Sequence, residues 1–124
     1  MLKHFVIFTF ENNFFKEEHF NEYVDAFSRI KEEYPKIKEI SIHRNCINRP
    51  ANMDLMIEMV LEDESVLSEY LNSPEHIRMG KKYNPHVANR VSFDYYIKKT
   101  LFTKFLQCEQ SLTLKTVFRQ SLLF

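Results

Sequence analysis

The five histidines of this chain are the side chains best suited to proton-transfer chemistry, because imidazole titrates near neutral pH. They are His4, His19, His43, His76 and His86. None has the carboxylate–histidine or cysteine–histidine spacing that is typical of a metal site. The chain also contains no Trp and no sequence motif typical of a haem ligand. We therefore expect neither a metal ion nor a cofactor.

The cysteine and glycine contents exclude further classes of site. Cys46 and Cys108 lie far apart and form no Cys-x-x-Cys pair, so they make neither a zinc site nor a disulfide scaffold. Their spacing leaves a bridge between them open, but we expect two reduced thiols. Gly80 is the single glycine. Phosphate-cradling loops of the P-loop and dinucleotide types need several glycines, so both are excluded.

Charge and hydropathy bear on partners and location. The chain has 17 basic and 17 acidic residues and no net charge, which argues against general nucleic-acid binding. The apolar N-terminal run is too short for a signal peptide, since Thr9 interrupts it and Glu11 follows without a cleavage site. No stretch approaches the ~20 apolar residues that span a bilayer. We expect a soluble cytoplasmic protein that contacts neither nucleic acid nor membrane.

The first two elements follow from residue periodicity. A length of 124 residues predicts one domain. Residues 3–10 are rich in Phe, Val and Ile, which favours a strand. Residues 16–34 carry apolar side chains three and four apart, which predicts an amphipathic helix that Pro35 ends. His19 lies beside Glu17 and Glu18 on the polar side of this helix, so we expect it to be solvent-exposed.

The rest of the chain alternates between period two and helical spacing. Residues 37–45, 53–61 and 91–97 read as strands. Asp63 is placed to cap one short helix, and Ser73-Pro74 opens another that ends at Asn84-Pro85. The order strand, helix, strand, strand, helix, strand predicts an α+β, ferredoxin-like fold. Its four-stranded antiparallel sheet would carry both helical segments on one face.

The second face of that sheet needs a cover of its own. In the first strand, Val6 and Phe8 alternate with Phe5 and Ile7, so both faces are apolar. A chain of this length has no element left to cover the second face. We therefore expect a homodimer that pairs sheet against sheet.

Five segments share a recognisable pattern: the opening strand at residues 1–8, the helix exit Tyr34-Pro35-Lys36-Ile37, Arg44-Asn45, the Tyr…Pro-x-His segment at residues 70–76 and Phe93-Asp94-Tyr95. In this order and spacing they resemble the stress-responsive A/B barrel (Dabb) family, within the dimeric α/β barrel superfamily. The resemblance covers residues 1–98 and implies a ferredoxin-like monomer that dimerises into an α/β barrel. It implies less about activity, because only a minority of members, plant polyketide cyclases among them, catalyse a cofactor-free aldol cyclisation.

The resemblance also suggests site residues. By motif, His4, Tyr70 and His76 correspond to the pocket residues of the cyclase-type members. In such a reaction His76 would remove a proton from carbon, Tyr70 would orient that base or donate to the oxyanion, and His4 would form a second polar wall. Ser73 stands where the cyclase-type motif often has His, which argues against the same substrate.

Three hypotheses remain open from the sequence. The first is a small dimeric Dabb protein that binds an apolar small molecule. The second is a cofactor-free enzyme, an aldol cyclase, lyase or isomerase, that uses His4, Tyr70 and His76. The third is a structural assembly protein that uses residues 99–124, an apolar extension outside the family pattern. Its spacing Leu114, Phe118, Leu122 is compatible with a helix. It could pack on its own domain, reach a partner subunit or build a higher oligomer.

Overall fold

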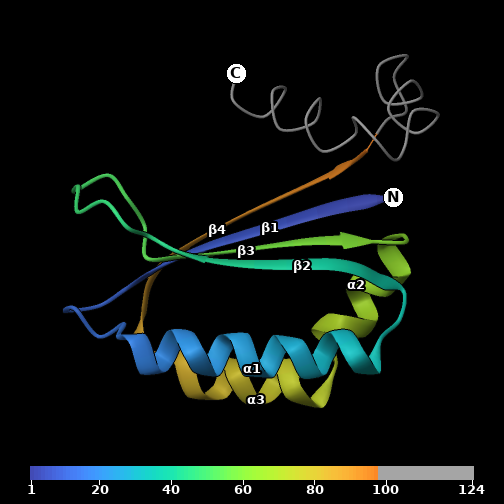
Figure 1. Cartoon of the computed structure of the whole chain (residues 1–124), viewed down its shortest axis with the longest axis horizontal. Coiled ribbons are helices and arrows are strands. Elements are labelled where there is room, and N and C mark those ends of the chain that lie inside the picture. The colour runs from blue at the N-terminus through green and yellow to red at the C-terminus, as the bar shows by residue number, and fades with distance from the viewer. Residues whose placement is uncertain (98–124) are drawn as a thin grey trace, which may run out of the picture.

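The chain folds as one antiparallel sheet with its helices on one side (Figure 1). The computed structural model describes residues 1–97, and the extension at residues 99–124 lies outside them. The elements are β1 (Leu2–Phe10), α1 (Glu17–Glu33), β2 (Ile37–Arg44), β3 (Leu55–Leu61), α2 (Glu64–Leu71), α3 (Pro74–Tyr83), the short 3₁₀ helix η1 (Asn84–His86) and β4 (Val87–Tyr96). The strand order is β2-β3-β1-β4. The predicted ferredoxin-like βαββαβ fold is confirmed.

The core lies between the sheet and the helices. Alternate residues of β1 and β3 point to this side, as period two requires, and Met59 and Leu61 are fully buried. The apolar stripe of α1 packs against them, with Ala26 and Ile30 also fully buried. Burial of each such large apolar side chain contributes roughly 1.5–3 kcal/mol. This layer fixes the relative positions of β1, α1 and the helices that follow β3.

Helix caps place α2 and α3 as the sequence predicts. The Asp63 carboxylate accepts a hydrogen bond from the Ser65 amide over 2.9 Å. The Ser73 hydroxyl, which is buried, accepts one from the His76 amide over 3.2 Å. Pro74 occupies the first turn of α3, where no amide hydrogen is needed. Ser73 thus fixes the start of α3 and, three residues on, the position of His76.

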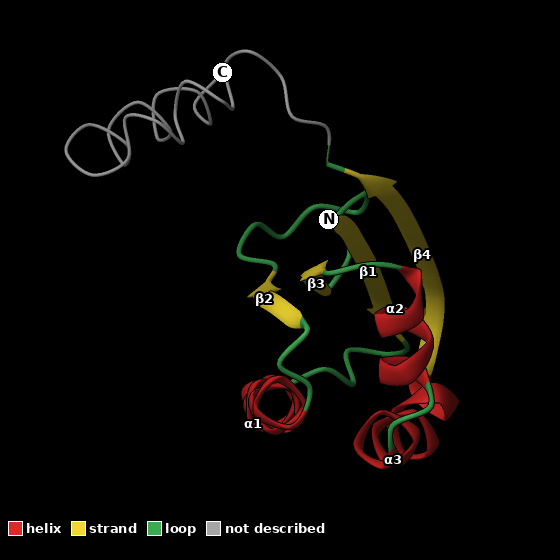
Figure 2. Ribbon diagram, turned by 90° about the vertical axis from the view of Figure 1, so that its right-hand side faces the viewer, coloured by secondary structure: helices red, strands yellow, loops and turns green. Residues whose placement is uncertain are grey.

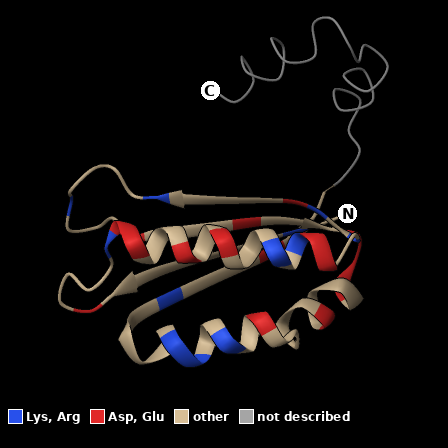
Figure 3. Ribbon diagram, turned by 60° about the horizontal axis from the view of Figure 1, so that its bottom comes forward, with Lys and Arg blue, Asp and Glu red and all other residues tan. Residues whose placement is uncertain are grey.

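Ion pairs join α3 to α1 across the outside of the helix layer. Figure 3 shows acidic and basic residues on both helices. Arg29 of α1 binds Glu75 of α3 over 2.6 Å, and Glu22 of α1 binds Lys82 of α3 over 2.7 Å. Hydrogen bonds from Arg78 and then Arg29 lower the pKa of Glu75 to about 2. Each exposed pair contributes little to stability, but together they fix the rotation of α3 against α1.

Two sequence predictions were wrong in detail. β4 begins at Val87, four residues before the predicted start at Val91. Asn89 and Arg90 have poor strand propensity, but pairing with Thr9 and Phe8 of β1 overrides it. His19 is half-buried, because its ring stacks on Phe14 at 4.4 Å between centroids.

Among residues 1–97, no helix lies on the other face of the sheet (Figure 2). β1 and β4 present apolar side chains there, and Phe93 is 64% exposed. We call this set the outer apolar patch: Phe5, Ile7, Val91, Phe93 and Tyr95. The rings of Phe5 and Tyr95 stack within it, with 6.1 Å between centroids. Within residues 1–97, no helix is long and apolar enough to cross a membrane.

Candidate functional site

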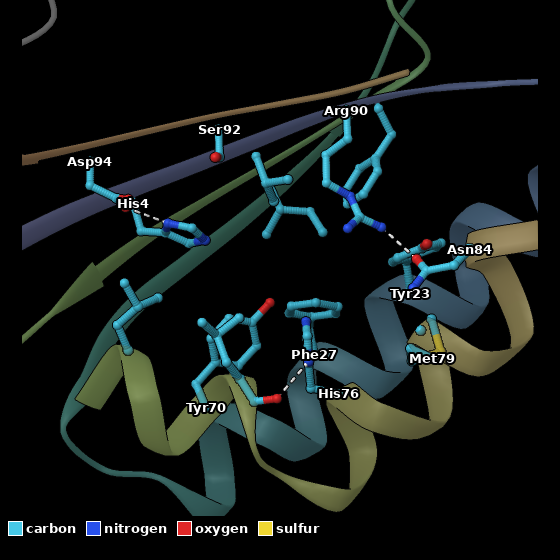
Figure 4. A pocket seen from close by; sticks show the side chains of 16 residues that line it. His4, Tyr23, Phe27, Tyr70, His76, Met79, Asn84, Arg90, Ser92 and Asp94 are labelled. Carbon is cyan, nitrogen blue, oxygen red and sulfur yellow. Dashed lines mark hydrogen bonds and ion pairs between the residues drawn. The ribbon is translucent and has the colours of Figure 1, made fainter. Parts of the chain in front are cut away.

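A cavity of about 280 Å³ opens between the β1–β4 side of the sheet and the three helices (Figure 4). Its wall combines apolar side chains with several polar ones. The lining residues are His4, Val6, Phe8, Tyr23, Phe27, Ile57, Leu67, Tyr70, Leu71, His76, Met79, Gly80, Asn84, Arg90, Ser92 and Asp94. All three site residues predicted from the sequence, His4, Tyr70 and His76, therefore line one cavity.

His4 lies on the buried face of β1, opposite Asp94 of β4 in the strand register. Its Nδ1 lies 2.5 Å from Asp94 Oδ1. An ionised carboxylate only accepts hydrogen bonds, so Nδ1 carries the proton and donates it to Asp94. The remaining ring nitrogen, Nε2, then has its lone pair available when the ring is neutral, or a second proton when the ring is charged.

His76 lies in the first turn of α3, and its Nδ1 is 3.0 Å from the Leu71 carbonyl oxygen. The carbonyl accepts, so Nδ1 is again the protonated nitrogen and Nε2 is left bare. Burial lowers the pKa of His76, the hydrogen bond to Leu71 opposes this, and the charges of Arg90 and His4 lower it further. The net lowering favours a neutral imidazole with a basic Nε2 at neutral pH.

Tyr70 lies between the two histidines and is almost completely buried. Its ring meets His76 edge-on at 4.7 Å between centroids and lies 6.3 Å from His4. Burial raises the pKa of Tyr70, so the hydroxyl stays protonated. Among the hydrogen bonds of the described residues, none involves this hydroxyl, and no buried side-chain polar atom there lacks a partner. The hydroxyl is therefore accessible from the cavity.

The polar lining residues that the sequence did not predict include Tyr23, Arg90 and Asp94. Tyr23 belongs to the apolar stripe of α1, which concealed the hydroxyl it brings to the cavity. Arg90 fell before the predicted start of the last strand. Asp94 could have been found, since alternation places it on the face opposite to Phe93 and Tyr95.

The cavity thus offers two imidazole Nε2 atoms, two tyrosine hydroxyls and an arginine around an apolar centre. This donor set suits proton transfer and hydrogen bonding to a small molecule. Within the part of the chain that the structure describes, no three His, Cys, Asp or Glu side chains are placed to hold a metal ion.

The sequence matches the model of a known protein family. The family model described as the stress responsive A/B barrel domain (Dabb) matches residues 2–97. The chain belongs to the Dabb family. This match covers every element from β1 to β4, and with them every residue that lines the cavity. A search of curated proteins finds no match.

Solved structures share the Dabb fold at low sequence identity. A dimeric ferredoxin-like protein of unknown function from Thermobifida fusca is 19% identical, with a TM-score of 0.66 over 77% of this chain and 90% of that one. A Dabb family protein from Mesorhizobium loti is 20% identical, with a TM-score of 0.61 over 79% and 97%. The hydroxynitrile lyase of Passiflora edulis is 14% identical, with a TM-score of 0.64 over 81% and 95%. At these identities the likeness establishes the fold alone.

Proposed function

We propose that this Dabb protein binds a small, largely apolar molecule in the cavity between sheet and helices. The observation that carries the proposal is the cavity itself, in which polar groups converge on an apolar centre. Phe27, Ile57 and Met79 provide apolar surface there, and His4 and His76 provide directional hydrogen bonds. Its volume of about 280 Å³ is near the lower end of the roughly 300–1,000 Å³ usual for ligand pockets, so the ligand is small.

Native mass spectrometry of the full chain purified from its own host tests ligand binding. We expect a bound small molecule that is released on denaturation. Leu67→Trp places a larger side chain into the cavity and should abolish retention. Ile77→Trp is the matched control, because Ile77 is exposed on α3 and does not line the cavity. Wild-type protein without a ligand, or equal retention by both variants, would contradict the proposal.

We further propose that two copies associate through the outer apolar patch. An exposed apolar surface of this kind marks an interface in soluble proteins. Because β1 and β4 pair along their length, the outer apolar patch extends along both strands. The similar protein of Thermobifida fusca is described as dimeric, which supports the proposal. Sedimentation equilibrium of the full chain should give twice the mass of one chain. A monomer at micromolar concentration would contradict it.

A cofactor-free enzyme is the second candidate, and the geometry of His76 specifically favours it. In an aldol-type reaction, His76 Nε2 would take a proton from a carbon next to a carbonyl, and the electron pair would move to the carbonyl oxygen. The Tyr70 hydroxyl donates a hydrogen bond to the resulting oxyanion. His4, held by Asp94, lines the same cavity as a second polar group. The similar hydroxynitrile lyase of Passiflora edulis supports the ability of this fold to carry catalysis.

Hydrogen–deuterium exchange at carbon tests the second candidate without knowledge of the natural substrate. Small methyl ketones are incubated in D₂O with the protein, and NMR follows loss of the α-proton signal. We expect His76→Gln and Tyr70→Phe to reduce the protein-dependent rate at least about tenfold. His43→Gln is the control, because His43 is exposed on β2. Equal rates with and without protein would leave only the binding function.

We also propose a cytoplasmic location. Cys46 is exposed and has no disulfide partner within residues 1–97, and exposed thiols persist in reducing compartments. Fractionation of host cells with an antibody to the protein tests this, and recovery from the secreted fraction would contradict it.

A further inference from the structure

We infer that the ligand of the cavity carries a carboxylate, and that Arg90 of β4 binds it at one end of the cavity. This rests on the proposed ligand binding and adds the chemical class of the ligand. Arg90 lies within residues 87–90 of β4, which the sequence did not predict as strand.

The cavity holds Arg90 in place by two contacts. Its Nη2 donates a hydrogen bond to Asn84 Oδ1, and its guanidinium carbon lies 5.1 Å from the centre of the Phe8 ring. Phe8 and Asn84 both line the cavity. Figure 4 shows the Arg90 side chain extending from β4 toward Asn84. The guanidinium is therefore fixed at the cavity wall, and its Nε and Nη1 groups remain available as donors.

Arg90 differs from the arginines of the helix layer in its partners. Arg29 and Arg78 each bind a glutamate of the network between α1 and α3. Among the ion pairs of residues 1–97, none involves Arg90. A cation beside an apolar wall loses hydration when a ligand enters, and this loss is offset only by a negative group. A planar carboxylate matches the geometry of the guanidinium donors.

The positive charge of Arg90 acts on the polar groups of the cavity. It adds to the lowering of the pKa of His76, and it opposes the burial that raises the pKa of Tyr23 and of Tyr70. All three side chains line the cavity. An anionic ligand group would thus enter a region where Arg90 contributes a positive electrostatic potential.

The opposite end of the cavity has the opposite charge. Asp94 lies on the same face of β4 as Arg90, four residues along the strand, which is about 13 Å. Asp94 binds His4 there and would repel a carboxylate. A linear apolar acid therefore has one favoured orientation. Its carboxylate lies at Arg90, and its chain runs between sheet and helices toward His4.

Calorimetric titration of the full chain with octanoate and with octan-1-ol tests the inference. The two probes share a chain length and differ in charge. We expect wild-type protein to bind octanoate about tenfold more tightly than the alcohol, the usual range for a partly exposed charged hydrogen bond. Arg90→Gln should remove this preference by weakening octanoate binding about tenfold more than octan-1-ol binding, and Arg90→Lys should retain part of the preference. Arg49→Gln is the matched control, since Arg49 is exposed in the β2–β3 loop.

The outcomes separate the two proposals. Equal affinity of wild-type protein for both probes, or an unchanged preference in Arg90→Gln, would overturn the inference and leave apolar ligand binding intact. Binding of neither probe would count against the proposed ligand binding as well, and against this inference with it. Thermal unfolding of Arg90→Gln is expected to match wild type, because Arg90 is exposed.

Discussion

The two faces of β1 and β4 differ in kind, although the same two strands form both. On the helix side, His4 and Asp94 pair beside Val6 and Phe8, and polar groups surround a cavity. On the other side, the outer apolar patch contains aromatic and aliphatic side chains that no other described element covers.

Because of this difference, we expect neighbouring residues of each strand to have different functions. A buried polar group has a desolvation cost that must be offset by a partner, so polar residues on the covered face indicate a ligand site. An exposed apolar group has no such cost in a complex and gains from coverage. We therefore assign ligand binding to the covered face and association to the open one.

The largest expected effect is a difference in unfolding free energy between substitutions on the two faces, at adjacent positions of β3. Leu61 is fully buried under the helices, and Val60 lies on the open face. Leu61→Ala should lower the free energy of unfolding by about 2–5 kcal/mol because it leaves a cavity. Val60→Ala should lower it by less than about 1 kcal/mol in the dissociated chain. Urea denaturation measures both, and equal losses would remove the distinction between the faces.

The next effect concerns association. Phe93→Asp puts a charge into the centre of the outer apolar patch, so the dimer would lose apolar burial and bury a carboxylate. We expect dimer affinity to fall at least about 100-fold, as measured by sedimentation. Asn89→Asp is the control on the same strand, outside the patch. A dimer that survives Phe93→Asp would contradict the assignment of the open face.

A smaller effect is the difference in unfolding free energy on removal of either of two tyrosine hydroxyls on the helix side. The Tyr83 hydroxyl donates a hydrogen bond to Glu22, whereas the Tyr70 hydroxyl faces the cavity. Tyr83→Phe should cost about 1 kcal/mol of unfolding free energy and Tyr70→Phe less than about 0.5 kcal/mol. Chemical denaturation measures both losses. A larger loss for Tyr70→Phe would mean that its hydroxyl stabilises the fold and is not reserved for a ligand.

The smallest effect is the pH dependence that His76 contributes. Folding lowers the pKa of His76 from 6.5, so the unfolded chain binds the proton more readily. The stability associated with neutral His76 is fully present above about pH 6.5 and is lost as pH falls through the folded pKa. Urea midpoints between pH 5 and pH 8 should therefore fall less with acid in His76→Gln than in wild type. An equal fall of the urea midpoint in both proteins would contradict this contribution of His76.

Much of the fold was predictable from periodicity and capping residues. The stripe of α1, the alternation of β3 and the caps Asp63 and Ser73 are local signals, and the structure confirms them. The start of β4 was not predictable, because Asn89 and Arg90 carry no strand signal. Their conformation follows from pairing with β1, which is a tertiary effect.

The residues of the candidate site were predictable only in part, because some of them depend on tertiary structure. His4, Tyr70 and His76 came from motif resemblance, and the structure brings all three to one cavity. Arg90 was not predicted as a site residue because it lies within residues 87–90, the start of β4 that carries no strand signal. Tyr23 was not predicted as a site residue because periodicity shows which face of α1 packs on the sheet but not which hydroxyl of that face reaches a cavity.

A methyl-labelled NMR titration of the full chain with octanoate tests most directly whether the covered face binds the ligand. The methyl groups of Val6, Ile57 and Leu67 line the cavity, and those of Ile7 and Val91 lie in the outer apolar patch. We expect saturable shifts of the first three signals and unchanged positions for the other two. Shifts confined to Ile7 and Val91 would contradict it.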